Sequence, residues 1–258
     1  MSGFDAPRFV ALAAARGLAL GHPVHAQPLT GSTNDDARLA ARNGAPHGAL
    51  FVADEQTHGR GRRGRQWMSP AGTSLLFSVL LRPRLEPGEA QALTLALGLA
   101  VRDVLAERVA VPVGLKWPND IVALGRKLAG LLVETQLQGS QLRAVVLGVG
   151  VNVGMRTLPE ALRDKATSLA LLGGRNLELE PLLVALLQDI DRRAGQYVQS
   201  GLRAMLPELL RHDVLRDRKV RVEDQTGTAR GIDGDGALII EDDDGRRHRI
   251  RGGSVEIT

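Results

Sequence analysis

Apolar residues recur along the chain with a helical period in some stretches and form short continuous runs in others. Helical spacing predicts helices over Phe9–Leu20, Ser32–Arg42, Ala90–Arg108, Pro181–Val198 and Leu202–Leu210. Short apolar runs predict strands over Leu50–Ala53, Thr73–Leu81, Gly130–Leu137 and Leu142–Val151. The last two strands meet at Gly139-Ser140, so we expect them to form a hairpin.

The pattern changes after His212. Short strands are expected at Lys219–Val222, Thr228–Ile232, Ala237–Ile240 and Arg247–Ile250, with turns rich in Gly and Asp between them. Short strands at such close spacing predict a small barrel-like module. We therefore divide the chain into a short N-terminal segment (residues 1–30), a main domain (31–211) and a C-terminal module (212–258).

Composition narrows the class of protein. Of the 258 residues, 43% are hydrophobic and 24% are charged, which allows a folded core. The chain contains no cysteine, so disulfides, thiolate metal sites and cysteine nucleophiles are excluded. No apolar run reaches the roughly 18 residues of a membrane-spanning helix, and we expect a cytoplasmic protein without a membrane partner. Asp5 before the first apolar run and Arg16 within it argue against a signal peptide.

The segment Gly59–Trp67 has the most distinctive charge pattern. It reads GRGRRGRQW, in which four arginines alternate with three glycines. Its GxGxxG spacing does not indicate a dinucleotide-binding fold, because no strand directly precedes it and no helix begins at the third glycine. Backbone N–H groups and guanidinium groups both bind phosphate oxygens. The alternative is a solvated basic loop, or one that contacts nucleic acid in a chain of net charge +4.

Lysine is rare in this chain, and two of its four lysines lie close together. Lys116 opens the string KWPND, which ends at Asp120, and Lys127 precedes the apolar run that begins at Leu128. Arginine is used almost everywhere else, so lysine here indicates a compact point charge that a planar guanidinium does not replace. The alternative is two surface lysines placed by chance.

Two further segments have both a structural and a functional interpretation. Gly148–Val153 (GVGVNV) places glycines in an apolar strand, which indicates a bulge or the close approach of a flat ligand, with Asn152 able to bind a purine or amide edge. Ser32, Thr33 and Asn34 are typical of a helix N-cap. No GxSxG, HExxH or GxxxxGK[ST] motif occurs, so the usual marks of serine hydrolases, zinc enzymes and P-loop NTPases are lacking.

In this order and spacing, the segments resemble the biotin protein ligase family. The matching strings are Gly31–Asn34 (GSTN), Gly59–Trp67, Lys116–Asp120, Arg126–Gly130 (RKLAG) and Gly148–Asn152. The resemblance runs from about Gly31 to the C-terminus. It implies an α+β fold, with a class II synthetase-like mixed sheet flanked by helices, as in the biotin and lipoate ligases, followed by an SH3-like β-barrel. It departs from the family at Gly31, where aspartate is frequent.

The resemblance implies a reaction in two steps. Biotin carboxylate attacks the α-phosphorus of ATP to give biotinyl-5′-AMP and pyrophosphate, with Mg²⁺ required. A lysine of a biotin carboxyl carrier protein, a subunit of acetyl-CoA carboxylase, then displaces AMP. Some members carry an N-terminal DNA-binding domain, but only about 30 residues precede Ser32, so no DNA partner is expected. A homodimer is compatible with the resemblance.

Two other functions are compatible with parts of the sequence. Lipoate and octanoate ligases share the catalytic fold, so transfer of those acyl groups is the main alternative. The arginine–glycine segment together with the KWPND string favours biotin. A basic nucleic-acid-binding module is a remote alternative, because aromatic residues for base stacking make up only 3% of the chain.

The resemblance also implies roles for individual residues. Lys127 and Arg62 are the expected catalytic residues: Lys127 stabilises the charge that develops at the α-phosphate, and Arg62 belongs to a loop that closes over the adenylate. The expected biotin site has polar groups for the ureido ring and glycines beside the valeryl chain: Ser32, Thr33, Asn34, Gln56, Arg60, Gly61, Arg62, Lys127, Gly130 and Gly150. The expected ATP and adenylate site comprises Arg60, Arg62, Arg65, Trp67, Lys116, Asn119, Asp120, Lys127 and Asn152. Trp67 and Asn152 are expected near the adenine, and the Mg²⁺ ligands are left unassigned.

Overall fold

The computed structural model describes residues 3–258, which contain a large sheet and a small one. The large sheet has seven strands in the order β1-β2-β3-β7-β6-β5-β4. Only β1 and β2 are parallel, and every other neighbouring pair is antiparallel, so the sheet is mixed as expected. Its strands are β1 (Val24–Thr30), β2 (Leu50–Gln56), β3 (Ser74–Leu81), β4 (Val113–Lys116), β5 (Asp120–Ala123), β6 (Arg126–Gln138) and β7 (Gln141–Asn152).

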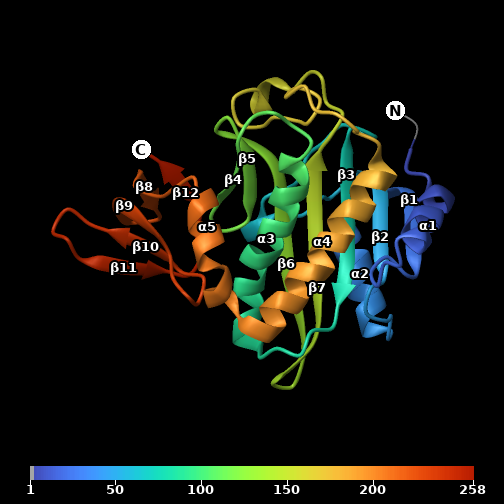
Figure 1. Ribbon diagram of the computed structural model, residues 1–258, viewed down its shortest axis with the longest axis horizontal. Coiled ribbons are helices and arrows are strands. Elements are labelled where there is room, and N and C mark those ends of the chain that lie inside the picture. The colour runs from blue at the N-terminus through green and yellow to red at the C-terminus, as the bar shows by residue number, and fades with distance from the viewer. Residues whose placement is uncertain (1–2) are drawn as a thin grey trace.

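Different helices cover the two faces of this sheet. α3 (Ala90–Ala106) and α4 (Leu179–Ser200) lie in front of β6 and β7 in Figure 1, and they form the main core with alternate strand residues such as Phe77. The opposite face packs against α2 (Thr33–Arg42) through a smaller core: Ala37, Ala41, Ala49, Phe51, Leu80, Ala144 and Val146. Even-numbered residues of β3 and β7 therefore face α2. The part of this face that α2 leaves uncovered holds the cavity described below.

The N-terminal segment belongs to the same layered unit. α1 (Ala6–Ala15) ends earlier than the predicted Phe9–Leu20 helix, because Gly17 takes a positive φ of 62° that ends the last turn. α1 packs on α4, and β1 pairs with β2 at the edge of the large sheet. The sequence did not predict β1, because its side chains between residues 25 and 29 are exposed and show no apolar alternation. Residues 3–30 thus do not stand apart from the main domain.

Two more strands escaped prediction. β4 and β5 have four residues each and form a hairpin around Trp117-Pro118-Asn119. Such short runs on either side of a proline give too little alternation to be recognised. The predicted helices Ala90–Arg108 and Pro181–Val198 and the predicted hairpin β6–β7 are confirmed within a few residues. The predicted Leu202–Leu210 helix begins as a 3-10 turn and continues as α5 (Leu206–His212).

The small sheet follows α5 and is antiparallel throughout. Its strands are β8 (Lys219–Val222), β9 (Gln225–Ile232), β10 (Leu238–Glu241), β11 (Arg247–Ile250) and β12 (Val255–Ile257). β12, which the sequence did not predict, pairs with β8. Leu238 and Ile240 join the main core, and Trp117 Nε1 donates to the carbonyl oxygen of Gly236 at 2.9 Å. The small sheet, at the left of Figure 1, therefore packs against the main domain.

Within residues 3–258, every helix is too short or too polar to span a membrane. The longest apolar helix, α3, is buried between the large sheet and α4. Its hydrophobicity is explained by this packing.

Candidate active site

A cavity of about 430 Å³ lies between the open part of the sheet face, the segment Gly59–Trp67 and the C-terminal module. Asn152 is the one sequence-predicted site residue that does not line it. The predicted residues that do line it are Ser32, Thr33, Asn34, Gln56, Arg60, Gly61, Arg62, Arg65, Trp67, Lys116, Asn119, Asp120, Lys127, Gly130 and Gly150. Motifs that are far apart in the sequence therefore meet at one place.

Glycines form the floor of the cavity. Gly150 pairs with Gly130 on β6 and with Leu76 on β3, and the β3–β7 register is regular throughout. A Cβ atom at Gly148 would lie 1.9 Å from Asn34 Oδ1, and one at Gly150 would lie 2.6 Å from the Trp67 ring. Glycine is needed here for close approach and not for a bulge, which settles the alternative that the sequence left open.

The group that approaches Gly130 and Gly150 is a side chain of this protein. The Trp67 indole lies against both glycines, whereas the sequence interpretation reserved that space for the valeryl chain. Lys127 Nζ lies 5.4 Å from the centre of the same ring, within range of a cation–π interaction. Trp67 therefore forms part of the cavity floor, beside Lys127.

One end of the cavity is neutral and hydrogen-bonded. Ser32 occupies the N-cap position of α2, but its side chain does not cap the helix. The backbone N–H and hydroxyl of Thr33 both donate to Gln56 Oε1, at 2.8 and 3.1 Å. Ser78, fully buried, donates to Asn34 Oδ1 at 2.6 Å and lies 2.8 Å from Thr33 Oγ1. The helix-cap interpretation is thus wrong: the Ser32 side chain makes no cap hydrogen bond, and the Thr33 and Asn34 side chains bond Gln56 of β2 and Ser78 of β3.

Sequence reasoning missed Ser78. The residue lies in the middle of the apolar run of β3, where every side chain is buried. A buried hydroxyl in such a strand requires a hydrogen-bond partner, and this requirement was the available signal. Its partners come from α2, which the sequence had not placed over β3.

The other end of the cavity is charged. Lys127 Nζ lies 2.6 Å from Asp120 Oδ1, an ion pair that joins β6 to β5. Asn152 supports this end from outside the cavity: its Nδ2 donates to the carbonyl oxygens of Thr167 at 2.9 Å and Lys127 at 3.4 Å. The sequence placed Asn152 near the adenine, but its buried side chain instead fixes the backbone that carries Lys127.

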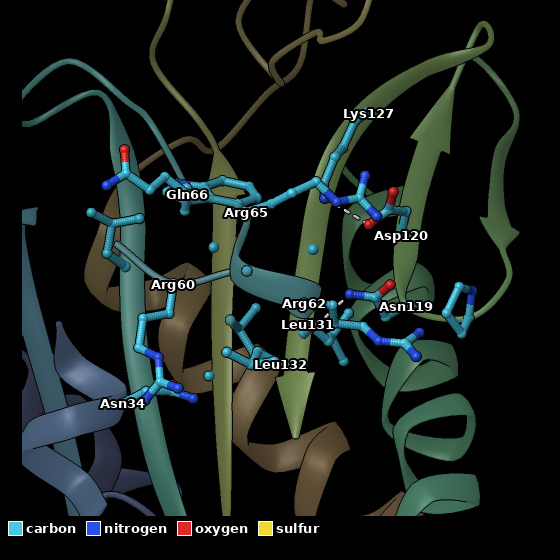
Figure 2. A pocket seen from close by; sticks show the side chains of 18 of the residues that line it. Asn34, Arg60, Arg62, Arg65, Gln66, Asn119, Asp120, Lys127, Leu131 and Leu132 are labelled. Atoms are coloured by element: carbon cyan, nitrogen blue, oxygen red, sulfur yellow. Dashed lines mark hydrogen bonds and ion pairs between the residues drawn. The ribbon is translucent and has the colours of Figure 1, made fainter. Parts of the chain in front are cut away.

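The arginines of the segment Gly59–Trp67 have different environments, as Figure 2 shows. Arg60 pairs with Asp35 and Glu134, whereas Arg62 extends toward Asn119 on the other side of the cavity. Burial lowers the pKa of Arg62, Asp120 partly opposes that shift, and Arg65 and Arg63 add to it. Within residues 3–258, no carboxylate forms an ion pair with Arg62. Its guanidinium therefore lines the cavity with the Asp120 carboxylate nearby but not paired with it.

The C-terminal module holds the far side of this segment. Arg63 pairs with Glu223 in the β8–β9 turn, and Arg65 donates to the hydroxyl of Ser254. Gly253, Ser254 and Val255 also line the cavity. The small sheet therefore completes the wall at the charged end.

Carboxylates are sparse in the cavity. Asp120 is the single Asp or Glu that lines it among the residues described. Over residues 3–258, no three His, Cys, Asp or Glu side chains gather as they would around a metal ion. A metal that bound here would take most of its ligands from a substrate or from water.

Comparison with known proteins agrees with this geometry. Residues 28–152 match the biotin/lipoate A/B protein ligase family, and residues 217–257 match the biotin protein ligase C terminal domain. A "Biotin--[acetyl-CoA-carboxylase] ligase" of Mycobacterium tuberculosis is 39% identical over 222 residues, 82% of this chain and 80% of the relative. A protein of that name in Paracoccus denitrificans is 33% identical over 227 residues, 84% of this chain and 94% of the relative.

Solved structures give the same result. Biotin protein ligase from Aquifex aeolicus in complex with biotin and ATP superimposes with a TM-score of 0.79 at 29% identity. The match covers 92% of this chain and all of the other one. Both sheets, the motif order and the cavity thus agree with the sequence relationships, and the chain belongs to the biotin protein ligase family.

Proposed function

We propose that this chain activates biotin with ATP and then attaches it to a lysine of the carboxyl carrier protein of acetyl-CoA carboxylase. One observation supports this most directly: the cavity has a neutral hydrogen-bonding end and a cationic end. Biotin has the same polarity, with a neutral ureido ring, an apolar chain and a carboxylate. ATP adds its negative charge at the end where the carboxylate would lie.

The neutral end suits a ureido ring. A cyclic urea presents one carbonyl acceptor and two N–H donors, and amide and hydroxyl side chains offer both kinds of partner. Thr33, Gln56 and Ser78 are already ordered by hydrogen bonds to one another. The dithiolane ring of lipoate has no N–H donor or carbonyl acceptor, so it would gain no hydrogen bonds from these groups. The pocket therefore favours biotin over lipoate.

The first step must overcome repulsion between two anions. Two unit charges about 4 Å apart repel by roughly 4 kcal/mol at an effective dielectric of about 20. Lys127 and Arg62 place positive charge at this end before the reactants meet. The carboxylate oxygen attacks the α-phosphorus, and the bond from that phosphorus to the pyrophosphate oxygen breaks. Asp120 occupies one N–H of the Lys127 ammonium and leaves the other two for the reacting oxygens.

Magnesium fits this site as an ion carried largely by phosphate. Mg²⁺ in nucleotide sites binds one or two carboxylates together with phosphate oxygens and water. Asp120 is the carboxylate placed to hold it, so we infer that it alternates between Lys127 and the metal. When bound, Mg²⁺ would neutralise charge on the triphosphate.

The second step requires a protected anhydride. The neutral amine of the carrier lysine attacks the biotinyl carbonyl carbon, the bond to AMP breaks, and the amine loses a proton as the amide forms. Water would compete for the same carbon, so the adenylate must be shielded until the carrier arrives. The segment Gly59–Trp67, held between Asp35 on one side and Glu223 on the other, is placed to shield it.

Incubation with labelled biotin, ATP and an apo-carrier domain tests the proposal. We expect one label per carrier lysine, with pyrophosphate and AMP released in equal amounts. A carrier in which that lysine is arginine is the matched control and should stay unlabelled. Incorporation of labelled lipoate in place of biotin would show that the chain is a lipoate ligase.

A further inference from the structure

Arg60 pairs with two carboxylates, whereas Arg62 forms no ion pair within residues 3–258. Its guanidinium lies 2.6 Å from Asp35 Oδ1 and 3.1 Å from Glu134 Oε1. Arg38 completes the group, 3.3 Å from Asp35 and 3.7 Å from Glu134. These two arginines and two carboxylates balance one another. Arg60 therefore contributes little net positive charge to the cavity, although the sequence assigned it to the adenylate.

Glu134 is the least exposed member of this group. Its side chain is 18% exposed, against 53% for Asp35 and 36% for Arg60. It projects from β6 on the face of the sheet that bears α2, opposite Val146 of the smaller core. Its second oxygen, Oε2, accepts a hydrogen bond from Asn34 Nδ2 at 2.8 Å. Glu134 is thus a fixed point on the rigid sheet, outside the cavity itself.

Glu134 also connects two parts of the site. Asn34 bonds Glu134 with its amide nitrogen and Ser78 with its oxygen, and Ser78 lies against Thr33 at the neutral end. The carboxylate that pairs with Arg60 is therefore anchored to the side chains that would hold the ureido ring. Figure 2 shows the Arg60 guanidinium beside Asn34, at this end of the cavity.

We propose that Glu134, assisted by Asp35, is the receptor that holds the segment Gly59–Trp67 closed over the biotin end by pairing with Arg60. This inference rests on the proposed function and divides the work of two arginines. Arg60 is a positioning residue that keeps the segment shut. Arg62, without a carboxylate partner in residues 3–258, faces the reactants. Loss of the receptor should open the segment and release the adenylate, while the Lys127–Asp120 pair on the sheet stays in place.

Glu134→Gln tests the receptor with almost no change in shape. The amide can still accept from Asn34 but no longer carries the charge that attracts Arg60. Trypsin reports opening directly, because Arg62, Arg63 and Arg65 are cleavage sites within the segment. With biotin and ATP bound, we expect cleavage there and escape of biotinyl-AMP both to rise about tenfold, as expected from loss of one charge-assisted hydrogen bond.

Two comparisons make the result specific. Glu178→Gln removes an exposed carboxylate that pairs with Arg8 at 3.2 Å, far from the cavity, and should leave both rates unchanged. Arg60→Gln removes the other partner and should match Glu134→Gln, and the double variant should be no worse than either single one. Additive effects would mean that the two residues act separately, which overturns the proposal.

The outcomes separate this inference from the proposed function. If the variants form adenylate but show wild-type cleavage and wild-type retention, the receptor is refuted and the ligase function stands. If wild-type protein forms no adenylate, the ligase function is refuted, and the cleavage rates without ligand still test the receptor. Should Glu134→Gln fail to fold, Arg60→Gln gives the same test from a surface segment.

Discussion

The two ends of the cavity are built in different ways. The neutral end consists of buried side chains on α2 and β3 and the partly buried Gln56 of β2, which bond one another, with Ser78 fully buried between Thr33 and Asn34. The charged end consists of long side chains, among them Arg62 and Arg65 of the segment Gly59–Trp67. This segment contacts the C-terminal module through Arg63 and Arg65. One end exists before ligand arrives, whereas the other depends on the position of a surface segment.

The two ends should therefore control different quantities, namely biotin affinity and the rate of adenylate formation. A preformed hydrogen-bonding end loses little entropy on binding, so it should determine how tightly biotin is held. Charges aimed at the reacting atoms matter most in the transition state, so they should determine how fast the adenylate forms. Substitutions at the neutral end should therefore change biotin affinity and stability together. Substitutions at the charged end should change rate or retention and leave stability almost untouched.

Lys127→Ala should give the largest effect. It removes the ammonium beside the reacting oxygens, and we expect adenylation to slow by about a thousandfold, the upper range for loss of one preorganised donor. Unfolding should change little, because the Lys127 side chain is partly exposed. Pyrophosphate release measured with saturating biotin and ATP checks this. Lys219→Ala, which removes an exposed lysine of β8, is the control, and a folded Lys127→Ala protein with unchanged release would contradict the assigned role.

Arg62→Gly should have the second-largest effect, mainly a loss of biotinyl-AMP retention. We expect escape of biotinyl-AMP and labelling of bystander lysines to increase by about a hundredfold, because a charge-assisted contact to the adenylate and the order of the segment are lost together. Mass spectrometry of added bystander proteins measures the labelling. Arg63→Gly is the comparison variant: it removes the pairing with the exposed Glu223 but no side chain that lines the cavity, and glycine tolerates the left-handed φ of 58°, so we expect a much smaller increase. Equal labelling by both variants would remove the special role of Arg62.

Ser78→Ala probes the neutral end. The substitution removes a buried hydroxyl that contacts both Thr33 and Asn34, and we expect a loss of about 2 kcal/mol in unfolding free energy. Biotin affinity should fall about tenfold, because the side chains that would hold the ureido ring lose their order. Calorimetry with biotin and denaturant unfolding measure the two quantities. A change in adenylation rate at saturating biotin, with affinity unchanged, would break the division between the two ends.

The sequence located the site well but described its contacts poorly. The strings at residues 59–67, 116–120, 126–130 and 148–152 contain most of the cavity, because each places scarce or unusual residue types together. The contacts that organise the site were not visible. Ser78 and Glu134 act through partners that only the folding of α2 and the segment Gly59–Trp67 onto the sheet provides.

Asn152 shows why the contacts of a motif residue are hard to predict from sequence. Its type and its position at a strand end suggested a purine contact, but the chain returns after β7 and offers the Thr167 carbonyl oxygen to its amide. A return of that kind depends on tertiary packing and leaves no periodic pattern. The missed strands also lie toward the sheet edges and are identified by their neighbours more than by their own sequence: β4 and β5 are short, and the side chains of β1 are mostly exposed.

Substitution of Asp213, at the junction that supports the charged end, should have the smallest effect on the protein. The residue follows α5, where the main domain meets the small sheet, and its Oδ1 accepts from the backbone N–H of Leu215 at 2.9 Å. Its Oδ2 is buried without a hydrogen-bond partner in residues 3–258. Burial raises the pKa of Asp213 from 3.8 to about 6, and the Leu215 N–H opposes this shift only in part.

A raised folded-state pKa fixes the sign of the pH dependence. Between about pH 4 and 6 the unfolded chain loses the Asp213 proton while the folded protein keeps it, so stability falls as pH rises through this window. Asp213→Asn should remove that slope and raise the unfolding free energy at pH 7 by about 1 kcal/mol, less than the full shift because the amide still buries an unpaired polar atom. Urea unfolding of both proteins at pH 4.5 and pH 7 measures this. The adenylation rate of the variant should be unchanged. A variant less stable than wild type at pH 7 would show that the Asp213 carboxylate is ionised and paired in the folded protein, and that the junction behaves like the charged end of the cavity.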